Sequence, residues 1–253
     1  MIRISRRLLA IASYVKRGSR VADIGSDHAL LPIYLIQQGI ALHAWAGEVN
    51  LGPMRAARRN VQAYGQSEHI EVRHGNGLDV LSEDDQVDCI TIAGMGGGLI
   101  VEILQAGREK LAAVKQLVLQ PNVGEEAVRR WLVQNGWKLE TEEILKEDGK
   151  IYEILSAVRA EDAEIGDVYP DSLTLSCGLA VTQDELFQYG PYLIQHPASA
   201  WLEKWQSETH KMEKILVNMA QSEQPEAISK REQFAHRLQR IKEVVHCLQK
   251  EQR

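Results

Sequence analysis

The sequence predicts an α/β protein in which a mostly parallel seven-stranded sheet ends in an antiparallel hairpin, followed by a helical region. Short β-rich runs alternate with helical stretches from Arg20 to Val158, and the last two runs flank the turn residues Asp148-Gly149. After Ala160 the alternation stops. Because alternating strands and helices form right-handed crossovers and a parallel sheet, we expect a sheet domain at residues 1–160 and a helical tail at residues 161–253.

The composition is that of an ordinary globular protein, since 44% of the 253 residues are hydrophobic and 25% are charged. No apolar run approaches the roughly 18 residues that a membrane span needs, because glycines interrupt the most apolar stretch at residues 90–104. Cys89, Cys177 and Cys247 are far apart, odd in number and without metal-ligand spacing. We therefore expect a reduced cytoplasmic protein with no metal site and no membrane contact.

The first segment, residues 1–14, combines arginines with apolar residues and superficially resembles a signal peptide. We favour a helix instead, because Leu8, Ile11 and Val15 recur at helical spacing behind Ser5, a good N-cap residue. A strand follows almost at once, so that cleavage here would cut into the fold.

The parallel part of the sheet is expected from five β-rich runs, at residues 21–24, 42–46, 70–73, 89–92 and 117–119. Helical stretches separate them at residues 30–38, 53–64 and 99–110, and another follows at 125–135. Glycines near the ends of several of these stretches are typical helix stop signals.

Two further strand-like runs, residues 137–145 and 151–158, are joined by a segment that contains Asp148-Gly149, a strong hairpin signal. Class I methyltransferases end an otherwise parallel sheet in this way, whereas dinucleotide dehydrogenases usually add another parallel strand. The hairpin therefore favours the Rossmann-like class I methyltransferase fold, by analogy of fold alone.

The tail begins with a loop-like stretch rich in glycine and proline and continues as two helical runs that separate near residues 221–225. Apolar residues recur in the second run at spacings of four and three, namely Phe234, Leu238, Ile241, Val245 and Leu248. The first run has a compatible stripe of Trp201, Trp205, Met212, Ile215 and Met219. We expect an antiparallel helical coiled coil.

The turn after the first strand, residues 23–28, lies where an α/β sheet binds its ligand. It has one glycine, Gly25, instead of the three that a dinucleotide pyrophosphate requires. Asp23 and Asp27 would repel a pyrophosphate but suit a ligand that carries an ammonium and a sulfonium. The alternative is that a strand-end aspartate caps the next helix.

Two further loops carry candidate ligand contacts. Glu48 follows Gly25 by 23 residues, close to the roughly 20 at which an acid reaches ribose hydroxyls in this architecture, and Val49 lies beside it. After the third strand, Asn76 and Gly77 could hold an adenine edge, or could form an ordinary turn.

Residues 93–98 have the sequence AGMGGG and so contain four glycines, with Ala93, Gly94 and Met95 at the start. Such a loop either bends tightly or lets another molecule approach closely, and we favour the second. A phosphate loop is disfavoured because the lysine and hydroxyl of a Walker motif are absent. Asn122, after the fifth strand, completes a ring of loops at one sheet edge and could contact RNA.

The net charge of −6 hides a basic segment at the start of the chain, where no acid precedes Asp23. Its proposed nucleic-acid contacts are Arg3, Arg6, Arg7, Lys16 and Arg17. A local field of this kind can attract an anionic partner. The alternative, for this cluster and for smaller ones at residues 55–59 and 129–130, is a solvated helix face.

Six segments together resemble one family, the bacterial tRNA adenine-22 N1-methyltransferases. They are VADIGSDH at 21–28, LPIYL at 31–35, GEVN with GP at 47–53, IAGMGG at 92–97, LQPN at 119–122 and GKIYE at 149–153. The resemblance covers about residues 1–160, and the helical tail fits it as well.

The resemblance implies S-adenosylmethionine as methyl donor and tRNA as substrate. It places Gly25, Ser26, Asp27 and His28 at the methionine side of the cofactor and Glu48 at the ribose, and Gly94 and Met95 line the transfer site. Asn76 departs from the family, where an aspartate is expected at the adenine. The loop at 93–97 also lacks the aromatic residue with which many amino-group methyltransferases stack their target base.

Adenine N1 has an in-plane lone pair, so it can take the methyl group directly and no strong general base is required. Asp27 and Met95 are the expected catalytic residues, because Asp27 and the backbone of Ala93 to Met95 are the candidates for placing the donor and contacting the adenine N6. N1 lies on the Watson–Crick edge, so the base must leave its stack. Two alternatives are a methyltransferase of a small molecule or protein and a non-catalytic RNA-binding module. No obligate protein partner is evident.

Overall fold

The structure, a computed structural model, describes residues 1–162, 166–219 and 225–251. The chain divides into two compact units, Met1–Val168 and Tyr169–Arg253. The division falls a few residues beyond the boundary expected at residue 160. No helix in the described parts of the chain has the length and apolar character to cross a bilayer.

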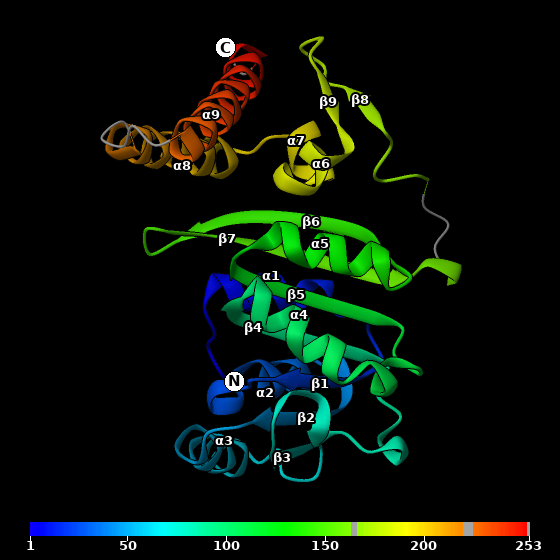
Figure 1. The fold of residues 1–253 in the computed structure, drawn as a ribbon. Coiled ribbons are helices and arrows are strands. Elements are labelled where there is room, and N and C mark those ends of the chain that lie inside the picture. The colour runs from blue at the N-terminus through cyan, green and yellow to red at the C-terminus, as the bar shows by residue number, and fades with distance from the viewer. Residues whose placement is uncertain (163–165, 220–224, 252–253) are drawn as a thin grey trace. The chain divides into compact units, whose positions relative to one another are not determined.

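The first unit is built on one seven-stranded sheet with the strand order β3-β2-β1-β4-β5-β7-β6 (Figure 1). Its strands are β1 Ser19–Ile24, β2 Ala41–Glu48, β3 Ile70–His74, β4 Cys89–Gly96, β5 Gln116–Val123, β6 Trp137–Glu147 and β7 Lys150–Arg159. The first five pair in parallel, and β7 pairs antiparallel with both β5 and β6. The expected mostly parallel sheet with a terminal hairpin is confirmed.

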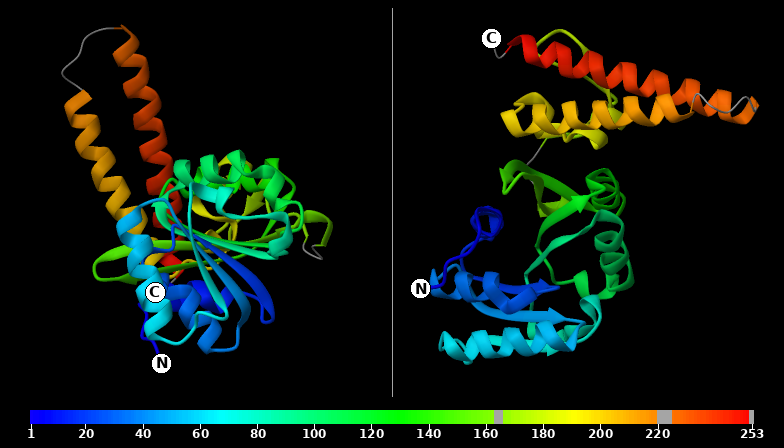
Figure 2. Two further views of the ribbon diagram at one scale, coloured as in Figure 1. Left: turned by 90° about the horizontal axis from the view of Figure 1, so that it is seen from below. Right: turned by 90° about the vertical axis from the view of Figure 1, so that its left-hand side faces the viewer.

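Helices cover both faces of this sheet, as in a doubly wound fold. They are α1 Arg6–Tyr14, α2 Leu30–Gln37, α3 Leu51–Ala63, α4 Gly97–Ala106 and α5 Glu125–Gln134. Helices α1, α2 and α3 lie on one face and α4 and α5 on the other (Figure 2). Short 3-10 turns, Asp27–Ala29 and Gly77–Val80 among them, follow β1 and β3.

Helix α1 forms as the apolar spacing predicts. Ile11 and Val15 are buried against the β1 and α2 side chains of the core, and the Ser5 hydroxyl accepts a hydrogen bond from the Leu8 amide. The Glu147 carboxylate, at the end of β6, also accepts bonds from the Arg6 and Arg7 amides, at 2.6 and 3.1 Å. The hairpin therefore supplies partners for amides that the helix itself leaves free.

The turn between β6 and β7 is the two-residue turn that the sequence predicts. Asp148 has φ 49° and Gly149 has φ 77°, and two consecutive residues with positive φ are what a tight hairpin turn requires. Glu147 pairs directly with Lys150 across the turn. The tip of the hairpin is thus fixed, together with the start of α1 that it contacts.

Arg129 corrects one expectation about the basic clusters. Its side chain, on α5, is fully buried and forms ion pairs with Glu142 of β6 and Glu153 of β7. Arg130 beside it is partly exposed and pairs with Glu126 one turn away. These two residues therefore do not form a basic surface together, because one charge belongs to the core.

The second unit starts with short strands and helices where the sequence indicates a loop-like stretch. They are β8 Ser172–Thr174, β9 Ala180–Thr182, α6 Gln183–Tyr189 and α7 Pro191–Gln195, followed by α8 Ser199–Met219 and α9 Pro225–Glu251. Strands of three residues are too short to show a periodic pattern. The expectation of a loop-like stretch is therefore wrong for these residues.

Helices α8 and α9 lie side by side and run in opposite directions (Figure 2). Trp201 and Trp205 of α8 are buried, as are Leu238, Ile241, Val245 and Leu248 of α9. The apolar stripe is not buried along its whole length, since Ile215 is 47% exposed. The antiparallel helical hairpin is confirmed, whereas the coiled-coil geometry stays a prediction.

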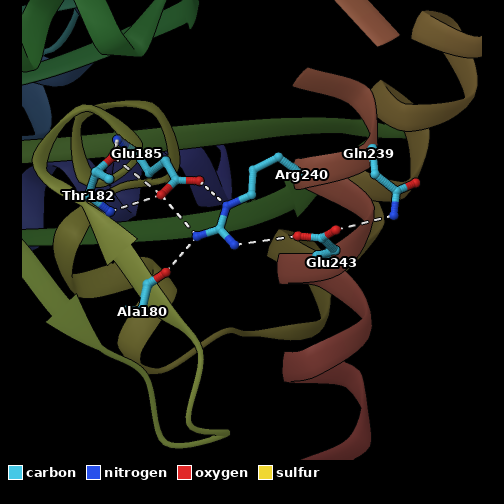
Figure 3. A network of polar contacts seen from close by, with 6 residues as sticks. All are labelled: Ala180, Thr182, Glu185, Gln239, Arg240 and Glu243. Atoms are coloured by element: carbon cyan, nitrogen blue, oxygen red, sulfur yellow. Dashed lines mark hydrogen bonds and ion pairs between the residues drawn. The ribbon is translucent and has the colours of Figure 1, made fainter. Parts of the chain in front are cut away.

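Helix α9 is also tied to the small hairpin and α6 of its own unit. Arg240 donates to both carboxylate oxygens of Glu185 and to the Ala180 carbonyl, and it pairs with Glu243 one turn along (Figure 3). Cys177 and Cys247 form a disulfide within this unit. The expectation of reduced cysteines is therefore wrong for these two, and Cys89 is free and buried.

Candidate cofactor and transfer site

The candidate residues gather because neighbouring parallel strands end at the same edge of the sheet. The Gly25 and Ser26 amides, after β1, both donate to the Gly47 carbonyl of β2 at 2.9 Å. The Gly75 amide, after β3, donates to the Glu48 carbonyl at 3.1 Å. The loops after β3, β2, β1 and β4 therefore form one continuous edge.

Asp23 anchors this edge from within the core. Its side chain is buried, and Thr91 of β4 donates its hydroxyl to Asp23 Oδ1 at 2.6 Å. Burial raises the pKa of the Asp23 carboxyl above its ordinary value, and the Ser26 and Thr91 hydroxyls and the charge of Arg7 oppose that rise only in part. Helix α2 has no side-chain cap, so neither Asp23 nor Asp27 caps it.

The turn that follows Asp23 is strained. His28 and Ala29 are consecutive non-glycine residues with φ of 62° and 53°, a conformation that costs about 1–2 kcal/mol per residue. Asn60 of α3 holds the turn by donating to the His28 carbonyl at 2.9 Å. The turn presents Asp27 with 70% of its side chain exposed, 3.3 Å from His28 Nε2. Strain of this kind is common at binding sites.

Gly25 and Met95 bring the turn after β1 into contact with the glycine loop after β4. Gly25 has φ 73°, and a Cβ atom built on it would overlap Met95 Cε. The methionine side chain therefore lies in the space that only a glycine leaves open. This contact joins the expected cofactor turn to the expected transfer loop.

Two polar groups at this edge fit a bound cofactor. The Ser26 hydroxyl is buried beside the Asp23 carboxyl, whose pKa it lowers, and it forms no hydrogen bond of full geometry among the described residues. Glu48 is buried, and its Oε1 accepts the Asn50 amide at 2.8 Å. Ligand hydroxyl or ammonium groups are the partners that such oxygens take.

The remaining predicted contacts lie along the rim of the same edge. Val49 is 53% exposed, and its carbonyl bonds to His74 Nε2 at 2.9 Å. Asn76 is exposed before a 3-10 turn, and Gly77, with φ 51°, packs beside Ile103 of α4. These groups border the edge without closing it.

Gln120 of β5 connects the glycine loop to α1, and nothing in the sequence had indicated this. Its Oε1 accepts from Arg7 Nη1 and from the Gly94 amide, and its Nε2 donates to Asn122 Oδ1. Asn122 Nδ2 in turn donates to the Gly94 carbonyl at 2.8 Å. Both backbone groups of Gly94 are thus held by side chains of β5.

The basic residues expected to contact RNA do not lie together. Arg7 reaches the glycine loop through Gln120, whereas Arg3 and Arg6 are exposed near the start of α1. Lys16 and Arg17 follow the other end of α1, where Lys16 contacts Gln116 at the start of β5 and Arg17 bonds to the Gly39 carbonyl. These last two residues are at the opposite, amino edge of the sheet.

The arrangement can bind a cationic, hydroxyl-bearing ligand at the strand ends and leaves the glycine loop open to a second molecule. Three or more histidine, cysteine or acidic side chains that could hold a metal do not occur together anywhere in the described ranges. Fold and site together are those of a class I methyltransferase, with its seven-stranded sheet and terminal hairpin.

Comparison with known proteins narrows this class. Residues 21–243 match the family described as tRNA (adenine(22)-N(1))-methyltransferase, and the chain belongs to that family. It is 39% identical over 245 residues to the tRNA (adenine(22)-N(1))-methyltransferase of Bacillus subtilis, covering 96% of this chain and 98% of that one.

Solved structures agree with this assignment. The crystal structure of the B. subtilis m1A22 tRNA methyltransferase TrmK superposes with a TM-score of 0.84 at 38% identity, covering 97% of this chain and all of that one. A Streptococcus pneumoniae protein described as a candidate tRNA (m1A22) methyltransferase was solved in complex with S-adenosyl-L-methionine. It superposes with a TM-score of 0.80 at 39% identity, covering 96% of this chain and 100% of that one.

Proposed function

We propose that this chain methylates N1 of adenine 22 in tRNA with S-adenosylmethionine as the methyl donor. The observation that supports this most directly is that Met95 of the glycine loop packs against Gly25 of the turn after β1, so that both loops meet at one sheet edge. Membership of the family supports the same activity.

The chain's own residues fit the cofactor. The turn Gly25, Ser26, Asp27 and His28 would hold the methionine end, where the buried Ser26 hydroxyl beside Asp23 offers a contact. Glu48 with Val49 would hold the ribose, and Asn76 with Gly77 the adenine. Ala93, Gly94 and Met95 would line the transfer site. When bound, S-adenosylmethionine supplies an electrophilic methyl group that the adenine N1 lone pair can accept.

The catalytic work of the protein is then positioning. Because N1 carries no proton, no side chain has to act as a general base. Asp27 would orient the donor and Met95 the approach of the base, and orientation of this kind can contribute about 7–11 kcal/mol in favourable cases. The held backbone of Gly94 keeps the loop in one conformation.

The tRNA must present its adenine out of the stack, because N1 lies on the Watson–Crick edge. We propose Arg3, Arg6, Arg7, Lys16, Arg17 and Asn122 as its contacts on this chain. A tRNA substrate also agrees with the expected cytoplasmic location.

The test is to map the methylated position. The protein is incubated with unmodified tRNA and isotope-labelled S-adenosylmethionine, and the RNA is analysed by mass spectrometry and by primer extension, which N1-methyladenine blocks. We expect one labelled adenine, at position 22, and none in a tRNA with guanine there. Label in no tRNA, together with calorimetry that detects no cofactor binding, would favour the non-catalytic alternative.

Asp27→Ala provides the matching variant. We expect it to abolish methylation without lowering the melting temperature, because the Asp27 side chain is exposed. Asp84→Ala, an exposed aspartate in another short turn, should be as active as the unaltered chain.

A further inference from the structure

A cavity of about 370 Å³ lies beside the glycine loop and has no role in the site described so far. It is lined by Asn122 at the end of β5 and by Lys150, Ile151 and Tyr152 at the start of β7. Because Asn122 donates to the Gly94 carbonyl at 2.8 Å, the cavity shares a wall with the transfer loop. The volume is enough for a single nucleobase.

One wall of this cavity is an aromatic ring with a fixed position. The Arg7 guanidinium lies over the Tyr152 ring, 5.2 Å from its centroid, and also donates to Gln120. Arg7 is itself held, because its amide and that of Arg6 bind the Glu147 carboxylate at the hairpin tip. Tyr152 is half-buried and is one of the residues that line the cavity.

The same cavity carries a positive charge. Lys150 is exposed and forms no ion pair within the described parts of the chain. Its backbone position opposite Glu147 is fixed by the tight turn. An aromatic face, an amide and a free ammonium in one cavity are the groups that proteins use for an unpaired nucleotide, which stacks its base and pairs its phosphate.

We propose that this cavity receives the unpaired target adenine, which stacks on Tyr152 while Lys150 pairs with an adjacent phosphate. Asn122, fixed to Gly94, then sets the distance between the stacked base and the transfer loop. Tyr152 thus supplies from the hairpin the aromatic ring that residues 93–97 lack. This inference rests on the proposed function, because a stacked adenine matters only if adenine is the substrate.

The experiment compares Tyr152→Leu with Tyr152→Phe. Tyr152 packs against the core cluster that contains Ile154, so leucine keeps apolar bulk and removes the π face, whereas phenylalanine keeps the ring. Loss of one stacked base corresponds to about 10- to 100-fold. We expect kcat/KM for tRNA to fall by that factor in the leucine variant and less than threefold in the phenylalanine variant. Tyr64→Leu, an exposed tyrosine at the end of α3, is the control.

Two readouts separate stacking from a general structural effect. S-adenosylhomocysteine affinity, measured by calorimetry, should be the same in all four proteins. With S-adenosylhomocysteine and saturating protein, tRNA carrying 2-aminopurine at the target position should fluoresce more brightly on Tyr152→Leu than on the unaltered chain, because stacking quenches this base. Lys150→Gln, which leaves the ring in place, should lower the salt slope of tRNA affinity by about one.

The outcomes are distinct. If the unaltered chain methylates tRNA and Tyr152→Leu has the same kcat/KM and the same fluorescence, the inference that the cavity binds the base is overturned and the proposed function is not. Equal loss in the leucine and phenylalanine variants, or a parallel loss of S-adenosylhomocysteine affinity, also overturns it. A wild-type chain that methylates no tRNA overturns the proposed function and this inference with it. If Tyr152→Leu does not fold, an unchanged salt slope in Lys150→Gln overturns the proposal.

Discussion

At the scale of single residues, the site depends on a glycine that leaves room for a methionine. Gly25→Ala would place a methyl group on Met95 Cε and would also force an L-residue to φ 73°. We expect S-adenosylmethionine affinity to fall about tenfold, because the turn takes up strain of about 1–2 kcal/mol and Met95 Cε, the end of a flexible side chain, is displaced. Calorimetry measures the affinity directly.

The control variant Gly65→Ala separates the strain of a positive φ from the overlap with Met95. Gly65 has φ 66° and has no atom within 4 Å of the added methyl group, so this variant carries the backbone strain of about 1–2 kcal/mol without the overlap. It should melt at a lower temperature but bind the cofactor normally. Equal affinities in Gly25→Ala and the unaltered chain would show that Met95 does not set the shape of the site.

Two adjacent arginines of α5 offer a second residue-scale test. Arg129→Met leaves the buried carboxylates of Glu142 and Glu153 without their cation, which typically costs about 3–5 kcal/mol. Arg130→Met removes only a partly exposed pair, worth about 0–1 kcal/mol. Urea unfolding should therefore give a much lower midpoint for the first variant. Similar midpoints would mean that the buried cluster contributes little.

At the scale of elements, Arg240 determines how firmly α9 is held to α6. Burial would raise the pKa of the Glu185 carboxyl, but the Arg240 guanidinium and the Thr182 amide hold it below its ordinary value. Such a carboxylate stabilises the fold fully above its unfolded pKa of about 4.5 and loses that contribution as the pH falls through the lowered folded pKa.

We therefore expect Arg240→Gln to lower the free energy of local unfolding of α9 by about 1–3 kcal/mol near pH 7. Faster hydrogen exchange of the α9 amides measures this loss. The difference from the unaltered chain should shrink below pH 4.5 as Glu185 is protonated, leaving the contribution of the bond from Arg240 to the Ala180 carbonyl. Arg237→Gln, an exposed arginine one turn earlier, should exchange like the unaltered chain at every pH. A difference that keeps its full size in acid would rule out Glu185 as the partner that matters.

Elements also explain which parts of the site could be predicted from the sequence. The loops after β1, β2 and β4 could be found because carboxyl ends of parallel strands meet, a rule that needs only strand order. Arg7, Gln120 and Tyr152 come from a helix, a strand and a hairpin far apart in the chain, and no local pattern links them. Arg129 was misjudged for the same reason, since a charge in the sequence does not reveal a buried partner.

At the scale of the whole molecule, the first unit offers tRNA two groups of basic residues. Arg3 and Arg6 lie near the hairpin end of α1, and Lys16 and Arg17 lie beyond its other end, at the amino edge of the sheet. Helix α1 has nine residues and is therefore about 14 Å long. One phosphate backbone can span that length, so both groups can contact a single tRNA.

Affinity measured against salt concentration tests this arrangement. If each residue pairs with one phosphate, replacing Arg3 and Arg6 by glutamine should lower the slope of log affinity against log salt by about two, and so should replacing Lys16 and Arg17. The exposed pair Lys110 and Lys115 serves as the control and should leave the slope unchanged. A slope altered by the first pair alone would mean that tRNA contacts only the edge that carries the glycine loop. Lys16 would then keep its ion pair with Glu140, 3.2 Å away, in the complex. A slope altered by neither pair would show that the charges around α1 face solvent and that other residues bind the phosphates.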